Sequence, residues 1–283
     1  MTNEPEIVVL PTPDAVSAAA AERVADTLRD AVDARGRADW ATTGGSTPIG
    51  IYRHLAVPPL RDVVPWEAVH LWWGDDRWVP RDHPLSNVLP ADAVLLGSTA
   101  RSGQSGFGED GIDVLSGREP GVPMPAGNVH PFPVTETVGD DHGPGIAAAR
   151  YEAQLRDNRL DVVDGFPVFD LVIVGIGPDG HLMSVFPGST TWDETAWALP
   201  VPAPTHVEPH VSRVTLNPRV LDVARNVLAV APGAAKADVL ARVFGPERDP
   251  RQIPAQAVRR PGVVWLVDEA AAEGLRSERP ATD

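Results

Sequence analysis

The chain has 283 residues, of which 43% are hydrophobic, and a formal net charge of -15 at pH 7. This length and composition suffice for one α/β domain with a large core, whereas the acidic excess argues against nucleic acids and anionic membranes as partners, because both attract basic surfaces. The sequence contains no cysteine, which excludes disulfides, thiolate nucleophiles and thiolate metal ligands.

The first residues predict neither a signal peptide nor a membrane anchor. The opening sequence is MTNEPEIVVL, which contains no basic segment and no long apolar run. Export signals need both features, and a membrane-spanning helix needs the apolar run. We therefore expect a cytoplasmic protein.

The N-terminal part is predicted to alternate strands and helices. Residues 7–10 have the composition of a strand, and apolar residues at intervals of four predict a helix that starts near Pro13 and ends at Gly36. A second strand at 39–42 leads into the sequence TGGSTP at 43–48.

The segment 43–48 has the character of an anion site. Thr47 is predicted to cap a helix that starts at Pro48. The glycines let the backbone approach a ligand closely, and the helix N-terminus offers free NH groups and the positive end of its dipole. A phosphate group would suit this site, and an ordinary turn is the structural alternative. A nucleophilic serine at Ser46 is disfavoured, because the pattern G-x-S-x-G needs glycine where this chain has Pro48.

A strand at 68–73 is followed by a charged sequence. Asp75, Asp76 and Arg77 come directly after this strand and its terminal glycine. Such a charge run is usually a solvated turn. Here it is one of several polar clusters that follow strands, and these clusters meet at one edge of a parallel sheet. The next region, 97–127, is rich in glycine and predicts a long loop.

The turn that follows the strand predicted at 171–174 carries the strongest indication of a catalytic site. Its apolar, β-branched sequence is typical of a strand covered on both faces, and Asp179 and His181 follow on a glycine-rich turn. The turn also matches the dinucleotide pattern G-x-G-x-x-G. That interpretation is disfavoured, because Pro187 cuts short the helix that the pattern requires and no acid follows about twenty positions later.

The remaining elements continue the alternation of strands and helices. They are predicted as a helix at 146–155, extended segments at 198–209 and 210–216, a helix from 217, a strand at 226–230, a strand at 263–267 and a closing helix capped by Asp268. The sequence shows no internal repeat and no linker rich enough to mark a domain boundary. It therefore predicts a single α/β domain.

Lysine usage singles out one position. Lysine and arginine together number 24, yet Lys236 is the only lysine. It is predicted in the first turn of a helix, where the dipole disfavours a cation unless an anion lies nearby. A site that needs a compact ammonium explains its retention, and chance retention on a helix surface is the alternative.

Taken together, these clusters resemble the family of 6-phosphogluconolactonases and glucosamine-6-phosphate isomerases or deaminases. The matching sequences are TGGSTP at 43–48, WGDDRWVP at 73–80 with SN at 86–87, GIGPDGHLMSVFPG at 175–188, RVTL at 213–216 and WLVDEAAA at 265–272. The resemblance spans most of the chain. It implies a Rossmann-like single domain over residues 1–283, with a mostly parallel sheet and helices on both faces. It also implies hydrolysis of the lactone of 6-phosphogluconate in the oxidative pentose phosphate pathway, without a cofactor or a metal.

The resemblance also implies roles for individual residues. The residues expected to hold the sugar phosphate are Gly44, Gly45, Ser46, Thr47, Arg213 and Lys236. Asp75 and Arg77 are expected at the sugar ring, and Asp179 and His181 at the reacting carbon. The chain departs from the family pattern at Asp76, where glutamate is commoner, and region 97–127 matches none of the motifs.

Two other functions remain as alternatives. The isomerase and deaminase branch carries a glutamate just before the proline that ends the histidine motif, and this chain has Phe186 there, which favours lactone hydrolysis. A sugar-phosphate sensor without turnover is the second alternative, but no DNA-binding segment fits before residue 7 and the charge is wrong for DNA. We expect a small sugar-phosphate lactone as the partner and a monomer or weak homodimer.

Histidine chemistry then gives a mechanism as a hypothesis. His181 is the candidate for activating water and later returning the proton, since histidine titrates near the working pH. Asp179 would set its tautomer or orient substrate hydroxyls, and Arg77 is the available cation for the oxyanion. A structural histidine held in the turn is the alternative for His181.

Overall fold

A seven-stranded parallel sheet forms the centre of the molecule. The computed structural model describes residues 4–97, 121–139 and 143–276. The strand order is β1-β12-β11-β8-β2-β3-β5, and every neighbouring pair is parallel. The strands are β1 (Glu6–Leu10), β2 (Ala38–Thr42), β3 (Val69–Trp73), β5 (Val129–His130), β8 (Leu171–Gly175), β11 (Val227–Val230) and β12 (Val263–Asp268).

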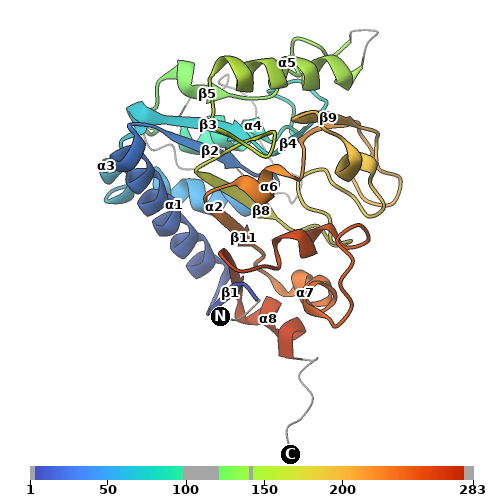
Figure 1. Cartoon of the computed structure of the whole chain (residues 1–283). Coiled ribbons are helices and arrows are strands. Elements are labelled where there is room, and N and C mark those ends of the chain that lie inside the picture. Colours follow the sequence, from blue (N-terminus) through green and yellow to red (C-terminus); the bar gives the residue numbers. More distant parts are fainter. Residues whose placement is uncertain (1–3, 98–120, 140–142, 277–283) are drawn as a thin grey trace, which may run out of the picture.

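Helices cover both faces of this sheet. The longer helices are α1 (Pro13–Arg35), α2 (Thr47–Leu55), α5 (Pro144–Asp157), α7 (Ala237–Phe244) and α8 (Glu269–Arg276), and the short ones are α3 (Leu60–Val63), α4 (Val88–Pro90) and α6 (Val220–Val223). The connections from β1 to β5 run along the sheet in one direction, and those from β5 to β12 run back. Because parallel crossovers are right-handed, the two sets of helices lie on opposite faces. Figure 1 shows α1 on one side of the sheet and α7 on the other.

The strand sequences explain why the sheet is buried. All five residues of β2 are buried, and the apolar residues of β8 are at most 2% exposed. Large aromatic side chains fill the spaces between the sheet and the helices, and the fully buried ones include Trp40, Trp66, Trp72, Trp73 and Trp265. Continuous apolar strands of this kind are typical of parallel sheets covered on both faces. The predicted α/β architecture is therefore confirmed.

A small antiparallel sheet was not predicted. It has the order β4-β10-β9 and consists of β4 (Asp75–Arg77), β10 (Arg213–Leu216) and β9 (Ala198–Val201). The sequence of β4 is three charged residues, so no hydrophobic alternation reveals it as a strand. Its pairing with β10 sets Arg213 opposite Arg77. The small sheet thereby joins two charged residues that are far apart in the sequence.

Several predicted boundaries differ from the structure. Helix α2 starts at Thr47 with Ser46 at the N-cap, so Thr47 does not cap it, and the Ser46 side chain makes no capping hydrogen bond. The helix expected from 217 is only the short α6. Most of the predicted loop at 97–127 lies outside the described residues.

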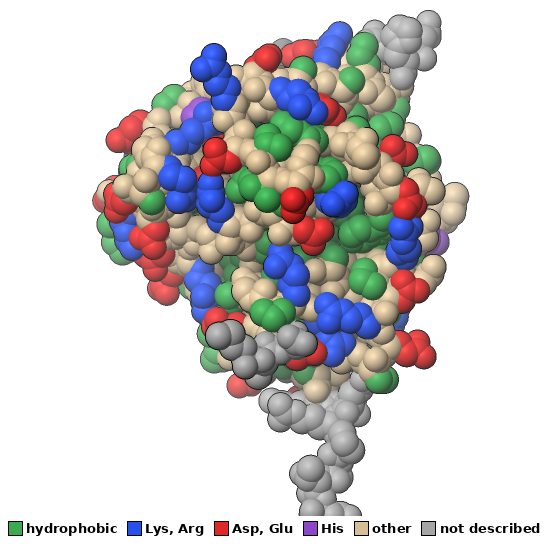
Figure 2. Space-filling model, viewed as in Figure 1, with side chains coloured by type: hydrophobic (Ala, Val, Ile, Leu, Met, Phe, Trp, Pro, Cys, Tyr) green, Lys and Arg blue, Asp and Glu red, His purple; other side chains and the backbone are tan. Residues whose placement is uncertain are grey.

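The surface is consistent with the charge argument from the sequence. On the face seen in Figure 2, acidic and basic side chains are interspersed. Of the helices in the described ranges, none is both long and apolar enough to cross a membrane.

Candidate active site

The sheet reverses its strand order between β2 and β8, and a pocket lies at their carboxyl ends. The chain leaves β2 toward β3 and leaves β8 toward β11, so the loops diverge and open a crevice between them. This pocket has a volume of about 300 Å³. Every residue predicted for the site lines it except Asp179. The polar strand ends therefore do meet, as the sequence predicts.

The loop after β2 forms one wall of the pocket. Gly45 has a φ of +73°, which an L side chain rarely adopts. Gly44 is equally constrained, because a Cβ there would lie 1.9 Å from Oδ1 of Asn87. Ser46 and Thr47 follow at the start of α2. This wall thus presents backbone and hydroxyl groups at close range, as an anion site requires.

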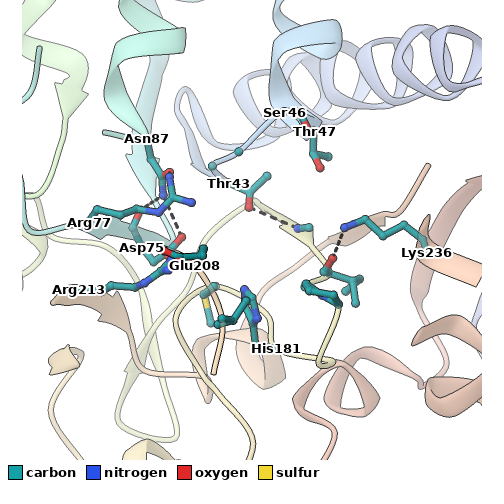
Figure 3. Close-up of a pocket in the computed structure, with 18 residues that line it drawn as sticks. Thr43, Ser46, Thr47, Asp75, Arg77, Asn87, His181, Glu208, Arg213 and Lys236 are labelled. Atoms are coloured by element: carbon teal, nitrogen blue, oxygen red, sulfur yellow. Dashed lines mark hydrogen bonds between the residues drawn. The ribbon is translucent and has the colours of Figure 1, made fainter. Parts of the chain in front are cut away.

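Lys236 enters the pocket beside the loop after β8. It lies in the 3-10 turn Ala234–Lys236 directly before α7, rather than in the first turn of that helix as predicted. Its Nζ donates a hydrogen bond of 2.8 Å to the carbonyl of Ile176. Figure 3 shows its ammonium group turned toward the pocket. A partly buried cation is therefore held at the pocket edge.

Asp75 and Arg77 form the opposite side of the pocket together with Asn87. The Nδ2 of Asn87 donates to the backbone carbonyl of Asp75 at 2.8 Å, and its Oδ1 accepts from Nη1 of Arg77 at 2.8 Å. Asp75 is 5% exposed, and its Oδ2 accepts a 2.6 Å hydrogen bond from Ser184. Asn87 therefore orients an acid and a cation that face the same space.

Asp76 points away from this pocket. Its Oδ1 accepts from the backbone NH groups of Asn87 at 2.7 Å and Arg77 at 2.8 Å, and it lines a separate cavity with Phe132. Burial raises the pKa of Asp76 to about 7, and the nearby charge of Asp75 adds to this, although the two NH groups and Arg77 oppose it. Asp76 holds the backbone of pocket residues instead of facing a ligand.

Arg213 reaches the pocket from β10 and is almost wholly buried. Its Nη2 donates to the carbonyl of Pro209 at 3.2 Å, and its guanidinium lies 5.4 Å from the centroid of the Phe186 ring. In Figure 3, Arg213 lies beside Arg77 and across the pocket from Lys236. The predicted phosphate residues therefore approach the pocket from two sides.

His181 is held by Asp179 on the turn that follows β8. Its Nδ1 lies 2.5 Å from Oδ1 of Asp179, and its backbone NH donates to the same oxygen at 3.1 Å. Burial alone would raise the pKa of Asp179, but hydrogen bonds and charge from His181, with a bond from His206, hold it well below its usual value. An ionised carboxylate only accepts hydrogen bonds, so Nδ1 of His181 is the donor. The basic nitrogen of neutral His181 is then Nε2.

Gly177 explains why the ring can take this position. A Cβ at Gly177 would lie 2.1 Å from Cε1 and Nδ1 of His181, so only glycine leaves room for the imidazole. The structure also argues against the dinucleotide interpretation of this turn. After Gly180 the chain forms turns and a bridge between Leu182 and Val185, where a dinucleotide-binding motif would have a long helix. Within the described ranges, no cluster of three His, Asp or Glu side chains could hold a metal ion.

The sequence did not reveal all residues of the pocket. Val207 and Glu208 line it, although their segment was expected only to be extended. Thr43 was quoted within a motif without a role, and its Oγ1 accepts from the backbone NH of Gly175 at 3.4 Å. Asn87 also stood in a motif, and an amide next to a charged turn was the one available signal for it. No local pattern marks Val207 or Glu208.

Comparisons with known proteins show which family the chain resembles. The model of the family described as glucosamine-6-phosphate isomerases/6-phosphogluconolactonase matches residues 11–266. The chain is 33% identical to a 6-phosphogluconolactonase of Synechocystis over 250 residues, which are 88% of this chain and 89% of the relative. It is 32% identical to a 6-phosphogluconolactonase of Mycobacterium tuberculosis over 272 residues, 96% of this chain and 98% of the relative. The solved 6-phosphogluconolactonase of Trypanosoma cruzi superposes with a TM-score of 0.78 at 27% identity and covers 98% of both chains.

Proposed function

The chain belongs to the family of glucosamine-6-phosphate isomerases and 6-phosphogluconolactonases, and from this premise we propose how its pocket acts on a sugar-phosphate lactone. The reaction is the hydrolysis of 6-phosphoglucono-1,5-lactone to 6-phosphogluconate in the oxidative pentose phosphate pathway. The observation that carries the proposal is a histidine fixed by an ionised aspartate in a pocket that has cations on two sides. Lactone hydrolysis involves no net oxidation or reduction, so the proposed reaction needs no redox cofactor.

The phosphate of the substrate binds at Lys236 and the loop formed by Gly44, Gly45, Ser46 and Thr47. The support is the combination of a compact ammonium with closely approachable backbone and hydroxyl groups in one pocket. Arg213 is the second cation of the phosphate site and approaches it from the other side.

The chemical step begins with His181. Nε2 takes a proton from water while the water oxygen attacks C1 of the lactone, and the carbonyl becomes a tetrahedral oxyanion. When this intermediate collapses, the bond between C1 and the ring oxygen breaks, and His181 returns its proton to that oxygen. The product acid then ionises in solution. Asp179 keeps Nδ1 protonated throughout, so it acts through His181 and without contact to the substrate.

The opposite wall receives the developing charge and the sugar ring. Arg77 stabilises the oxyanion, because Asn87 and the carbonyl of Leu85 hold its guanidinium at 2.8 and 2.9 Å. Asp75 accepts hydrogen bonds from hydroxyl groups of the substrate. Asn87 positions both residues for these roles.

Phe186 favours hydrolysis over deamination. Its ring packs against His181 with a centroid separation of 4.7 Å, at the position where the deaminase branch has a carboxylate in the resemblance noted above. An aromatic ring cannot accept a proton or orient the imidazole by a hydrogen bond. We also propose that the protein is a monomer or a weak homodimer. Light scattering across a concentration series would test this oligomeric state.

The decisive measurement is a lactonase assay at controlled pH on 6-phosphoglucono-1,5-lactone, corrected for spontaneous hydrolysis. We expect a clear rate above buffer, and His181→Ala should lower kcat by about 10² to 10⁴-fold, as for a positioned general base. A wild-type rate equal to buffer would leave a binding protein without turnover. Release of fructose 6-phosphate from glucosamine 6-phosphate at a comparable rate would instead assign the deaminase function.

A further inference from the structure

A second histidine shares the carboxylate that holds His181. Nε2 of His206 lies 2.9 Å from Oδ2 of Asp179, while Oδ1 of the same carboxylate is engaged by His181. His206 comes from a segment 27 residues further along the chain, and it does not belong to any of the sequence motifs. The carboxylate therefore bridges two imidazoles that the fold brings together.

Phe186 packs against both imidazoles. Its ring centroid lies 4.7 Å from that of His181 and 5.8 Å from that of His206, the latter in an edge-to-face arrangement. The Asp179 side chain is 17% exposed, whereas that of His206 is 49% exposed. One side of His206 thus faces solvent, and the other faces a largely enclosed carboxylate.

We propose that His206 is a positioning residue of the catalytic site, which donates Nε2–H to Asp179 and thereby fixes the carboxylate that orients His181. The inference rests on the lactonase function proposed above. Because Oδ2 is occupied by His206, the carboxylate cannot rotate without breaking that bond, and Oδ1 stays aligned with Nδ1 of His181. The bond also divides the negative charge of Asp179 between two donors.

Other charged groups near this pair have separate partners. Arg242 donates to the backbone carbonyl of Asp179 at 3.3 Å. Arg213 lies over the Phe186 ring, and Glu208 pairs with His210 at 3.1 Å. Lys236 binds the carbonyl of Ile176 on the other side of the turn. In the described structure, His181 and His206 are the two side chains seen to hydrogen-bond the Asp179 carboxylate.

The test compares His206→Ala with His206→Gln. We expect His206→Ala to lower kcat by about 5- to 30-fold, in the lower range for a hydrogen bond to a charged group because the imidazole is half exposed. The acid limb of the profile of kcat/KM against pH should also move to higher pH, since an Asp179 that has lost one donor attracts the proton of His181 more strongly. Glutamine can place an amide NH near the Nε2 position, so His206→Gln should restore kcat to within about threefold of wild type.

His210→Ala is a matched control on the same segment. His210 has a comparable side-chain exposure of 48%, and it contacts the carbonyl of Pro204 at 2.7 Å and the carboxylate of Glu208 at 3.1 Å. Within the described part of the chain it forms no hydrogen bond or ion pair with Asp179. If His206 only anchored this segment over the pocket, both alanine variants would raise KM and leave the acid limb in place. That result would overturn the inference.

A double-mutant cycle adds a second criterion. In an Asp179→Asn background, His206→Ala should change kcat less than about twofold, because the charge through which it acts is gone. Additive losses would contradict the proposal, and thermal melting of each variant shows whether it is folded. Suppose that the wild type hydrolyses the lactone, that His181→Ala does not, and that His206→Ala has the kcat of the wild type. In that case the role of His206 is wrong, and the lactonase function stands. A wild type without lactonase activity would remove the proposed function itself.

Discussion

Lys236 stands at the start of α7, where the helix dipole opposes a cation and a bound phosphate would compensate for it. Replacing it with alanine should lower kcat/KM on the phosphorylated lactone by about 10- to 150-fold, the range for a hydrogen bond between charged groups. Glucono-1,5-lactone lacks the phosphate, so its slow hydrolysis should change less than about threefold. Equal losses on both substrates would assign Lys236 to the carbonyl or to the fold.

Arg213→Ala in the same pair of assays tests the other side of the pocket. If Arg213 binds the phosphate, Arg213→Ala should lower kcat/KM on the phosphorylated lactone much more than on glucono-1,5-lactone, as expected for Lys236→Ala. If both lactones lost activity equally, Arg213 would instead support Arg77, which it faces across the β4–β10 pair.

Asp76 gives a prediction about the dependence of stability on pH. Its pKa of about 7 in the folded protein exceeds the ordinary value near 4. Between about pH 4 and pH 7, Asp76 is therefore protonated in the folded chain and ionised in the unfolded chain. The carboxyl therefore destabilises the fold increasingly as the pH rises from about 4 to about 7, and fully above that. Asp76→Asn can keep both hydrogen bonds from the backbone, and it should raise the melting temperature at pH 8 by a few degrees more than at pH 5. A uniform shift at both values would exclude this explanation.

Residue type and position after a strand could predict several polar residues of this site, but not all of their hydrogen-bond partners. His181, Asp179 and Lys236 stand out because few residue types can do their work and because they follow strands. His206, Val207 and Glu208 depend on how one extended segment crosses the pocket, which is a tertiary contact without a local signature. Asn87 is an intermediate case, because its amide becomes informative only when β4 sets Asp75 and Arg77 around it.

At the level of elements, the glycine turn after β8 is a rigid support for the histidine. A methyl group at Gly177 would overlap the His181 ring and push it off its aspartate. Gly177→Ala should therefore lower kcat by at least about tenfold, part of what a positioned base contributes. The melting temperature should change little, because the ring lines the pocket and can move into it. Gly127→Ala is the control, since a Cβ there meets nothing within 4 Å. Activity near wild type in Gly177→Ala would mean that the ring adjusts freely.

Largely apolar segments bounded by turn residues were enough to predict six strands of the central sheet, namely β1, β2, β3, β8, β11 and β12. Strand β5 was missed, because its two residues, Val129 and His130, are too few to form a pattern. The small sheet could not be predicted from local sequence. Strand β4 is too short and too charged to be recognised, and it exists because β10 satisfies its backbone groups. The helix boundaries near 47 and 236 shifted by about a turn or less, since caps depend on geometry that composition does not determine.

For the whole molecule, a pair of histidines at the sheet edge should make stability sensitive to acid. Nδ1 of His70 on β3 lies 2.9 Å from Nε2 of His130 on β5, and Trp72 stacks on His130. Burial, together with His70 and Arg37, lowers the pKa of His130 to about 4, and burial also lowers that of His70. Unfolding therefore takes up protons between about pH 6.5 and 4, and stability should fall across this window as the pH decreases.

Chemical denaturation at pH 7 and pH 5 would measure the effect. The slope contributed by each histidine is at most about 1.4 kcal/mol per pH unit. At pH 7, His130→Gln should have a lower free energy of unfolding than wild type, because its packing is weaker. Between pH 7 and pH 5, however, its free energy of unfolding should fall less than that of wild type. An identical loss in both proteins would place the acid sensitivity elsewhere.

The pairing of β1 with β12 has a consequence for how the chain acquires its structure. Glu6 is in register with Val264, so within the described ranges β1 has a single sheet neighbour, which lies far along the chain. During translation, β1 and the exposed Val9 must wait while α1 and the pocket strands form, because the closing of so long a loop comes late in folding. The catalytic loops can thus take shape on a nascent chain whose outermost strand is still unpaired, and that edge is where a holding chaperone would have most to protect.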